Sequence, residues 1–121
     1  MKRNNVLLEK SFAFAVRAVR LSRYLQREKR EYVLSRQLLR CGTSIGANLE
    51  EAMGGHSKKD FFAKLTIAYK EARESRYWIR LLYETDYLTN IEAQSLLSNI
   101  EELLRIIGSI QKTIKSQNKN P

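Results

Sequence analysis

Apolar residues recur along the chain at intervals of three and four residues, the spacing that gathers them on one face of an α-helix. Short polar or glycine-containing stretches interrupt this pattern three times. The pattern predicts helices at about residues 6–29, 35–53, 58–83 and 90–115, with a polar tail at 116–121. Four helices of this length joined by short turns fit an all-α, antiparallel up-down-up-down four-helix bundle, which we expect to form a single domain of 121 residues.

The stretch Gln37–Met53 carries the clearest apolar face. That face comprises Leu38, Cys41, Ile45, Leu49 and Ala52. Gly42 and Gly46 lie on its flank, although a glycine inside a helix costs about 1 kcal/mol relative to alanine. Because the apolar spacing keeps its phase across both glycines, we predict an unbroken helix in which they mark the close approach of a neighbour, either another helix of the bundle or another subunit.

The third predicted helix has two adjacent apolar seams. One runs from Phe61 to Leu82, and the other includes Ile67, Trp78 and Leu81. A helix in a four-helix monomer needs about one stripe. The second seam therefore indicates contact with another copy of the chain, unless both neighbouring helices cover one broad face. The predicted interface residues are Gly42, Gly46, Ile67, Trp78 and Leu81.

In the first predicted helix the apolar stripe is Leu8, Phe12, Ala15 and Val19, widened by Val16 and Leu25. The starts of the later helices carry capping signals. Ser35 and Ser57 are each predicted to accept a hydrogen bond from an unpaired backbone N–H, and Thr89 with Glu92 makes a capping box.

Polar residues follow the edge of the Gln37–Met53 apolar face, where an unpaired polar group costs about 1–3 kcal/mol. We expect the members of this row to hydrogen-bond with two glutamates of the third helix and so to fix the register of the two helices. The predicted network comprises Arg40, Ser44, Asn48 and Glu51 with Glu71 and Glu74.

Charge changes this picture at one end of the chain. The sequence holds 22 Lys and Arg against 13 Asp and Glu, a net charge of +9, and most of the excess lies in residues 1–36. Glu28 is the only acid within a row of arginines there, whereas a surface laced with ion pairs alternates in sign. The row is either a solvated face or a phosphate-binding surface. The predicted nucleic-acid-binding residues are Arg17, Arg20, Arg23, Arg27 and Arg30. Tyr24 and Tyr32 are candidates for stacking on unpaired bases, unless both are packed.

Candidate chemistry is sparse. The single cysteine, Cys41, cannot form an internal disulfide, which favours a reducing cytoplasm. The single histidine, His56, falls in a predicted loop, and no glutamate lies three residues before it as a di-metal bundle requires. We therefore expect no catalytic set, no metal site and no cofactor. No apolar run reaches the roughly 20 residues of a membrane span, so no membrane partner is expected.

The segments QLLRCGTSIGANLEEAMGGHSKKDF and AYKEARESRYWIRLL carry a family resemblance. They resemble the four-helix-bundle family of 23S rRNA intervening-sequence proteins. The matching residues are Gln37, Arg40, Ser44, Gly46, Asn48, Glu51, Phe61, Glu71, Glu74 and Trp78. The resemblance implies a bacterial cytosolic protein without catalytic activity that forms a ring-shaped homopentamer. A related branch, which matches Gln37–Glu51 less well, serves as the accessory subunit of a reverse transcriptase in diversity-generating retroelements and binds nucleic acid through a basic surface.

These features together predict a non-enzymatic, homo-oligomeric scaffold that binds nucleic acid, RNA in preference to DNA, through the arginine row. The alternative is a protein-interaction adaptor, for example an accessory subunit of a reverse transcriptase or of another nucleic-acid enzyme.

Overall fold

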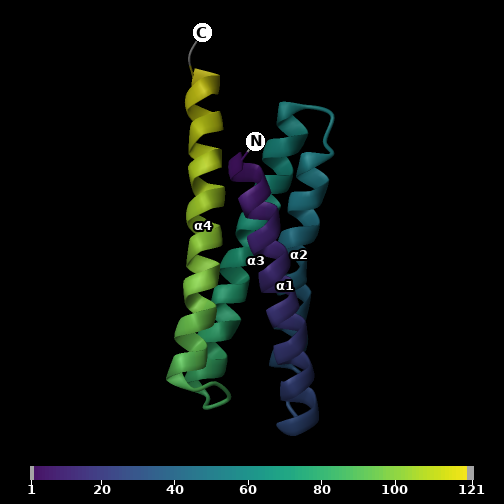
Figure 1. The fold of residues 1–121 in the computed structure, drawn as a ribbon, viewed down its shortest axis with the longest axis vertical. Helices are drawn as coiled ribbons and strands as arrows, with labels where there is room; N and C mark the ends of the chain where they lie inside the picture. Colours follow the sequence, from purple (N-terminus) through teal and green to yellow (C-terminus); the bar gives the residue numbers. More distant parts are fainter. Residues whose placement is uncertain (1, 120–121) are drawn as a thin grey trace.

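The computed structural model of the protein describes residues 2–119, which form four α-helices and no strand. The helices are α1 (Lys2–Glu28), α2 (Leu34–Met53), α3 (Lys58–Glu84) and α4 (Asn90–Lys119). They run alternately in opposite directions, so that the α1–α2 and α3–α4 connections lie at one end of the bundle (Figure 1). Each helix packs on the next along the chain, and α1 also packs on α4 through a smaller contact. The predicted all-α, antiparallel four-helix bundle is confirmed.

The helix bounds differ from the sequence prediction mainly at the outer ends. α1 begins at Lys2 rather than near residue 6, and α4 runs to Lys119 rather than ending near residue 115. The polar tail was expected from residue 116, yet residues 116–119 are helical, because no glycine or proline in that stretch interrupts the backbone hydrogen bonds. Residues 120–121 lie outside the described range.

The core includes the predicted inward faces of three helices, together with buried residues of α1. The face of α2 is fully buried, as predicted, and so is most of the first α3 seam, including Leu65 and Ile79. α4 contributes a run of buried leucines and isoleucines, among them Ile100, Leu103 and Ile107. Three-and-four periodicity was therefore sufficient to identify the inward faces of α2, α3 and α4.

The predicted stripe of α1 is wrong at its four main positions, none of which is fully buried, whereas Leu25, which widened the stripe, is buried. Phe12 was expected in the core, but 71% of its surface is exposed, and Val19 is only half-buried. The inward face is instead shifted by about one residue and contains small polar positions. Its residues are Leu7, Ser11, Phe14, Ala18, Ser22 and Leu25. The serine hydroxyls are satisfied locally: that of Ser11 donates to the carbonyl of Leu8 at 3.1 Å, so they can replace apolar groups at little cost.

The small α1 face explains the glycines of α2, which continues unbroken through both of them. A Cβ added to Gly42 would come within 2.8 Å of the Ala18 Cβ, closer than two such atoms approach in proteins. At Gly46 an added Cβ would lie 3.5 Å from the Ser11 side chain, which is ordinary contact. The close neighbour that the glycines indicated is therefore α1 of the same chain.

Two predicted caps are confirmed, and the third is wrong. The Ser57 hydroxyl accepts the Asp60 N–H at 3.1 Å, and Thr89 and Glu92 exchange both capping-box hydrogen bonds, at 2.9 and 3.2 Å. Ser35, however, lies inside α2, which begins at Leu34.

The carboxylate of Glu31 caps α2 in place of the Ser35 hydroxyl. It accepts the backbone N–H groups of Val33, Leu34 and Ser35 at 2.7–3.1 Å. Burial alone would raise the pKa of Glu31, but these three N–H donors outweigh it and hold the pKa below its ordinary value. Glu31 is therefore a buried, ionised cap.

None of the helices within residues 2–119 combines the length and the apolar character that crossing a lipid bilayer requires.

Candidate nucleic-acid interface

Four of the five predicted nucleic-acid-binding arginines are exposed. Arg20, Arg23 and Arg27 lie on the outer side of α1, and Arg30 lies in the α1–α2 connection in a left-handed conformation, with φ of 55°. No ion pair among the described side chains involves any of the four. Their guanidinium groups therefore face solvent without a carboxylate partner.

Arg17 differs from the other members of the row. It is half-buried, and its guanidinium donates a hydrogen bond to the side-chain oxygen of Asn99 in α4. Since this bond joins residues 82 positions apart, no spacing rule in the sequence indicated it. The structure thus places Arg17 in the α1–α4 contact, and the exposed row consists of four arginines.

Folding brings two further cations beside this row. Lys29 is exposed just after α1, and Arg36 is exposed in the first turn of α2, where its guanidinium lies 5.8 Å from the centre of the Tyr32 ring. The sequence prediction missed both because they lie outside the helical row. The short turn predicted between the first two helices could have indicated that both cations lie near the row. We call this surface the basic end; it comprises Arg20, Arg23, Arg27, Lys29, Arg30 and Arg36.

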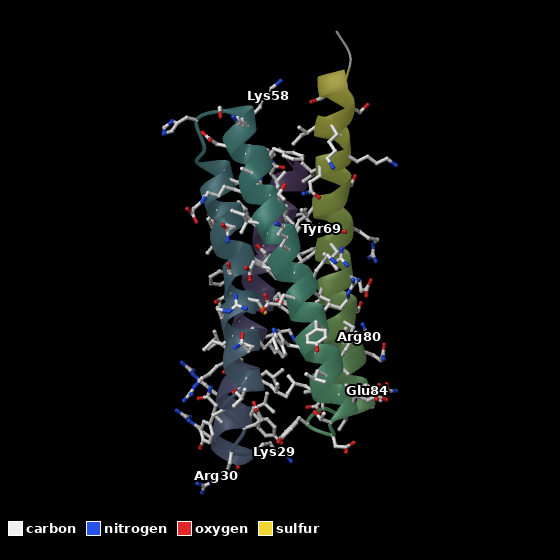
Figure 2. All side chains as sticks on the ribbon, turned by 180° about the vertical axis from the view of Figure 1, so that it is seen from behind. Lys29, Arg30, Lys58, Tyr69, Arg80 and Glu84 are labelled. Atoms are coloured by element: carbon white, nitrogen blue, oxygen red, sulfur yellow. The ribbon has the colours of Figure 1, made fainter. Side chains whose placement is uncertain are left out.

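The other half of the same bundle end is acidic. Glu84, Asp86 and Glu92 are all exposed around the α3–α4 connection. Figure 2 shows Lys29, Arg30 and Glu84 at one end of the bundle and Lys58 at the other. The hydrogen bonds from Thr89 hold the pKa of Glu92 below its ordinary value, so this carboxylate stays ionised at neutral pH. At this end of the bundle, cations therefore lie around the α1–α2 connection and exposed carboxylates lie around the α3–α4 connection.

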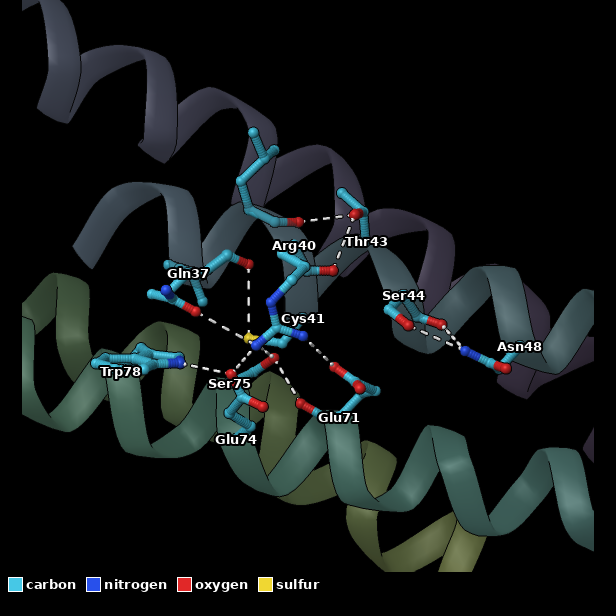
Figure 3. Close-up of polar contacts among 12 residues, drawn as sticks. Gln37, Arg40, Cys41, Thr43, Ser44, Asn48, Glu71, Glu74, Ser75 and Trp78 are labelled. Atoms are coloured by element: carbon cyan, nitrogen blue, oxygen red, sulfur yellow. Dashed lines mark hydrogen bonds and ion pairs between the residues drawn. The ribbon is translucent and has the colours of Figure 1, made fainter. Parts of the chain in front are cut away.

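Of the predicted polar row on α2, only Arg40 reaches the two α3 glutamates. Its guanidinium lies 3.4 Å from the Glu71 carboxylate and also pairs with Glu74, which in turn accepts the indole N–H of Trp78 at 2.9 Å (Figure 3). About half of the Arg40 side chain is exposed, and ion pairs at such positions add little stability. The network joins α2 to α3 and orients Trp78 rather than holding the fold together.

The other members of the polar row do not reach the α3 glutamates. The amide of Asn48 donates within α2, to the carbonyl and hydroxyl oxygens of Ser44 at 2.9 and 3.0 Å (Figure 3). Glu51 pairs with Lys64 at 3.1 Å, one and a half turns into α3. The prediction was wrong for these three residues because a neighbouring partner on the same helix or a nearer cation satisfies each of them.

The predicted oligomer interface must be revised at the glycines. Gly42 is buried beneath α1, so it cannot contact a second subunit, and Gly46 also has α1 as its neighbour. Ile67, Trp78 and Leu81 of α3 remain candidates: Ile67 is 40% exposed, and the other two are half-buried. Trp78 is thus neither enclosed by the bundle nor fully exposed.

The described residues contain no group of three or more His, Cys, Asp or Glu side chains placed to hold a metal ion. A hollow of about 540 Å³ lies at the end opposite the basic end, between His56 and the apolar side chains of Phe61, Ile110 and Ile114. His56 is exposed in the α2–α3 connection, as the sequence predicted.

Comparison with known proteins places this fold. A family model described as 23S rRNA-intervening sequence protein matches residues 3–109. The chain is also similar to a crystal structure described as a protein of unknown function from the S23 ribosomal protein family of Bacteroides thetaiotaomicron VPI-5482. The two share 45% sequence identity and a TM-score of 0.89, with 91% of this chain and 98% of that chain covered. Neither description names an enzymatic activity, and no protein with a curated description matches. Because the family match spans most of the sequence, this chain belongs to the 23S rRNA-intervening sequence protein family.

Proposed function

We propose that the protein is a non-enzymatic cytoplasmic scaffold that binds nucleic acid, RNA in preference to DNA, through the basic end. The observation that carries this proposal is the set of exposed arginines, from Arg20 to Arg30, without carboxylate partners. Guanidinium groups in this state bind phosphates and release counterions, a contact that does not depend on base sequence. The preference for RNA is supported by the family description, which names an rRNA intervening sequence.

We further propose that several copies assemble into one particle. Apolar side chains are exposed on two unlike faces, with Phe12 on α1 and with Ile67 and the 55% exposed Tyr77 on α3. Two different faces suit head-to-tail contacts that close into a ring, and the pentamer implied by the family resemblance is such a ring. Repeating the basic end around a ring would add weak phosphate contacts into useful affinity.

The direct test reverses three charges on α1. We expect the Arg20→Glu, Arg23→Glu, Arg27→Glu variant to lose RNA binding at low salt and to keep its helical content and assembly state, because all three side chains point into solvent. For the wild-type protein, four phosphate contacts per protomer predict a slope of about −3 for the logarithm of the association constant against the logarithm of salt concentration. Fluorescence anisotropy with labelled RNA measures the loss of binding and the salt dependence, and circular dichroism and light scattering measure the helical content and the assembly state.

The matched control carries the same change of net charge elsewhere: Lys70→Glu, Arg105→Glu, Lys112→Glu, all exposed on α3 and α4. This variant should bind RNA within about threefold of the wild type, since only long-range attraction is lost. Equal loss of binding in both variants, or no binding by the wild-type protein at low salt, would remove the proposal.

A second candidate function is a protein-interaction adaptor. It is favoured by a shallow apolar hollow of about 270 Å³ between α1 and α2, lined in part by Phe12, Ala15 and Ala47. A partner that remains bound after nuclease treatment and is released by Phe12→Ser would support this function.

A further inference from the structure

We infer that the basic end binds single-stranded RNA in preference to double-stranded RNA, with Tyr24 and Tyr32 stacking on unpaired bases. This inference rests on the proposed function and specifies its substrate.

The first observation is the exposure of the two rings. Tyr24 is 45% and Tyr32 is 42% exposed, so a large part of each side chain faces solvent. Tyr24 lies in α1 between Arg23 and Arg27, and Tyr32 lies two residues after Arg30. Tyr24 lies four residues before the end of α1, about 6 Å along the helix axis at 1.5 Å per residue, and Tyr32 lies in the connection that follows. Two exposed tyrosine rings thus lie within residues 20–36, which also hold the six cations of the basic end and one exposed acid, Glu28.

The second observation is the contact between Arg36 and Tyr32. The guanidinium lies 5.8 Å from the ring centre, within the range of a cation–π interaction. This contact limits the motion of an otherwise exposed ring and keeps a cation next to it. A nucleotide needs both elements, a flat apolar surface for its base and a positive charge for its phosphate.

Base stacking on these rings requires unpaired nucleotides. In a duplex both faces of every interior base are covered by neighbouring base pairs, and the major groove of A-form RNA is too narrow for side chains to enter. A duplex could therefore use only the arginines. A single strand could use the arginines and the tyrosines together, which is the physical origin of the expected preference.

The acidic half of the bundle end adds to this preference. Glu84, Asp86 and Glu92 repel phosphate on the α3–α4 side. A flexible single strand can follow the basic end and turn away from these carboxylates. A duplex is stiff over this length, so it would carry some phosphates toward them.

The test compares binding of an oligouridine strand and of an RNA duplex of equal length, about a dozen nucleotides, to the wild-type protein and to tyrosine variants. We expect Tyr24→Ala and Tyr32→Ala each to weaken oligouridine binding about tenfold and to leave duplex binding nearly unchanged, because each removes one stacked base. Tyr24→Phe and Tyr32→Phe should bind like the wild type, since they keep the ring.

Ile91→Ala is the control. Ile91 is a large apolar side chain that is 82% exposed at the start of α4, and it belongs neither to the basic end nor to the faces proposed for assembly. Loss of oligouridine binding in Tyr24→Ala and Tyr32→Ala but not in Ile91→Ala supports the inference. Equal binding of both RNAs, with no effect of the tyrosine variants, overturns it and leaves the proposed function standing. Failure to bind either RNA overturns both.

Discussion

Cys41 occupies the middle of the α2–α3 contact. Its sulfur lies 3.2 Å from the hydroxyl oxygen of Ser75, which in turn lies 2.9 Å from the carbonyl oxygen of Glu71. Burial, only partly offset by the Ser75 hydroxyl, raises the pKa of the Cys41 thiol to about 11. Since the thiolate is the nucleophile, Cys41 acts as a small packing residue rather than a reactive group.

This thiol should resist labelling in the folded protein. At pH 8 we expect native Cys41 to react with an aromatic disulfide reagent at least about a hundredfold more slowly than the same residue in urea-unfolded protein, because burial both lowers its thiolate fraction and blocks access. The absorbance of the released thiol measures the two rates. Native and unfolded protein reacting at similar rates would contradict the burial of Cys41.

At the scale of elements, apolar periodicity identified the inward faces of three helices but not that of α1. Counting apolar residues favoured Phe12 and Val19, whereas the true inward face contains Ser11 and Ser22. Those serines, with the glycines of α2, let the two helices approach closely. A pattern of apolar residues cannot reveal a seam made of small ones. The α2 start was misread for a related reason, since its cap, Glu31, acts from two residues before the usual position.

The Glu31 cap makes the stability of the bundle depend on pH. Because the folded-state pKa is lower than the ordinary value, Glu31 stabilises the folded state fully above about pH 4–5, and this stabilisation is lost as the pH falls through the folded-state pKa. We expect Glu31→Gln to lower the free energy of unfolding at pH 7 by about 1–2 kcal/mol, since one of two accepting oxygens becomes an NH₂ group. Urea unfolding followed by circular dichroism measures the difference.

Glu28→Gln provides the comparison, because Glu28 is exposed at the end of α1 and caps nothing. It should unfold at nearly the same urea concentration as the wild type. The difference in the free energy of unfolding between the wild type and Glu31→Gln should also become smaller as the pH is lowered below about 4. A difference in the free energy of unfolding that stays unchanged at low pH would show that Glu31 acts through its shape rather than its charge.

At the scale of the whole molecule, the bundle distributes two kinds of surface. One cluster of exposed cations lies at the bundle end formed by α1 and α2, whereas apolar side chains such as Phe12, Ile67 and Tyr77 are exposed along the sides. The sequence predicted the arginine row because the row follows one helix. The sequence prediction missed Arg36 because this residue comes beside the row only when α2 packs against α1. It included Arg17 because the contact of Arg17 with Asn99 forms only when α4 packs against α1. In the proposed assembly the side surfaces form the contacts between copies, which would leave the basic ends available for nucleic acid.

The most direct test of this account is the solution mass of the purified protein, measured by light scattering with ultraviolet absorbance before and after nuclease treatment. The account predicts a particle several times the 14.1 kDa of one chain, carrying nucleic acid before treatment and keeping the same protein mass afterwards. A 14.1 kDa particle free of nucleic acid under both conditions would contradict it.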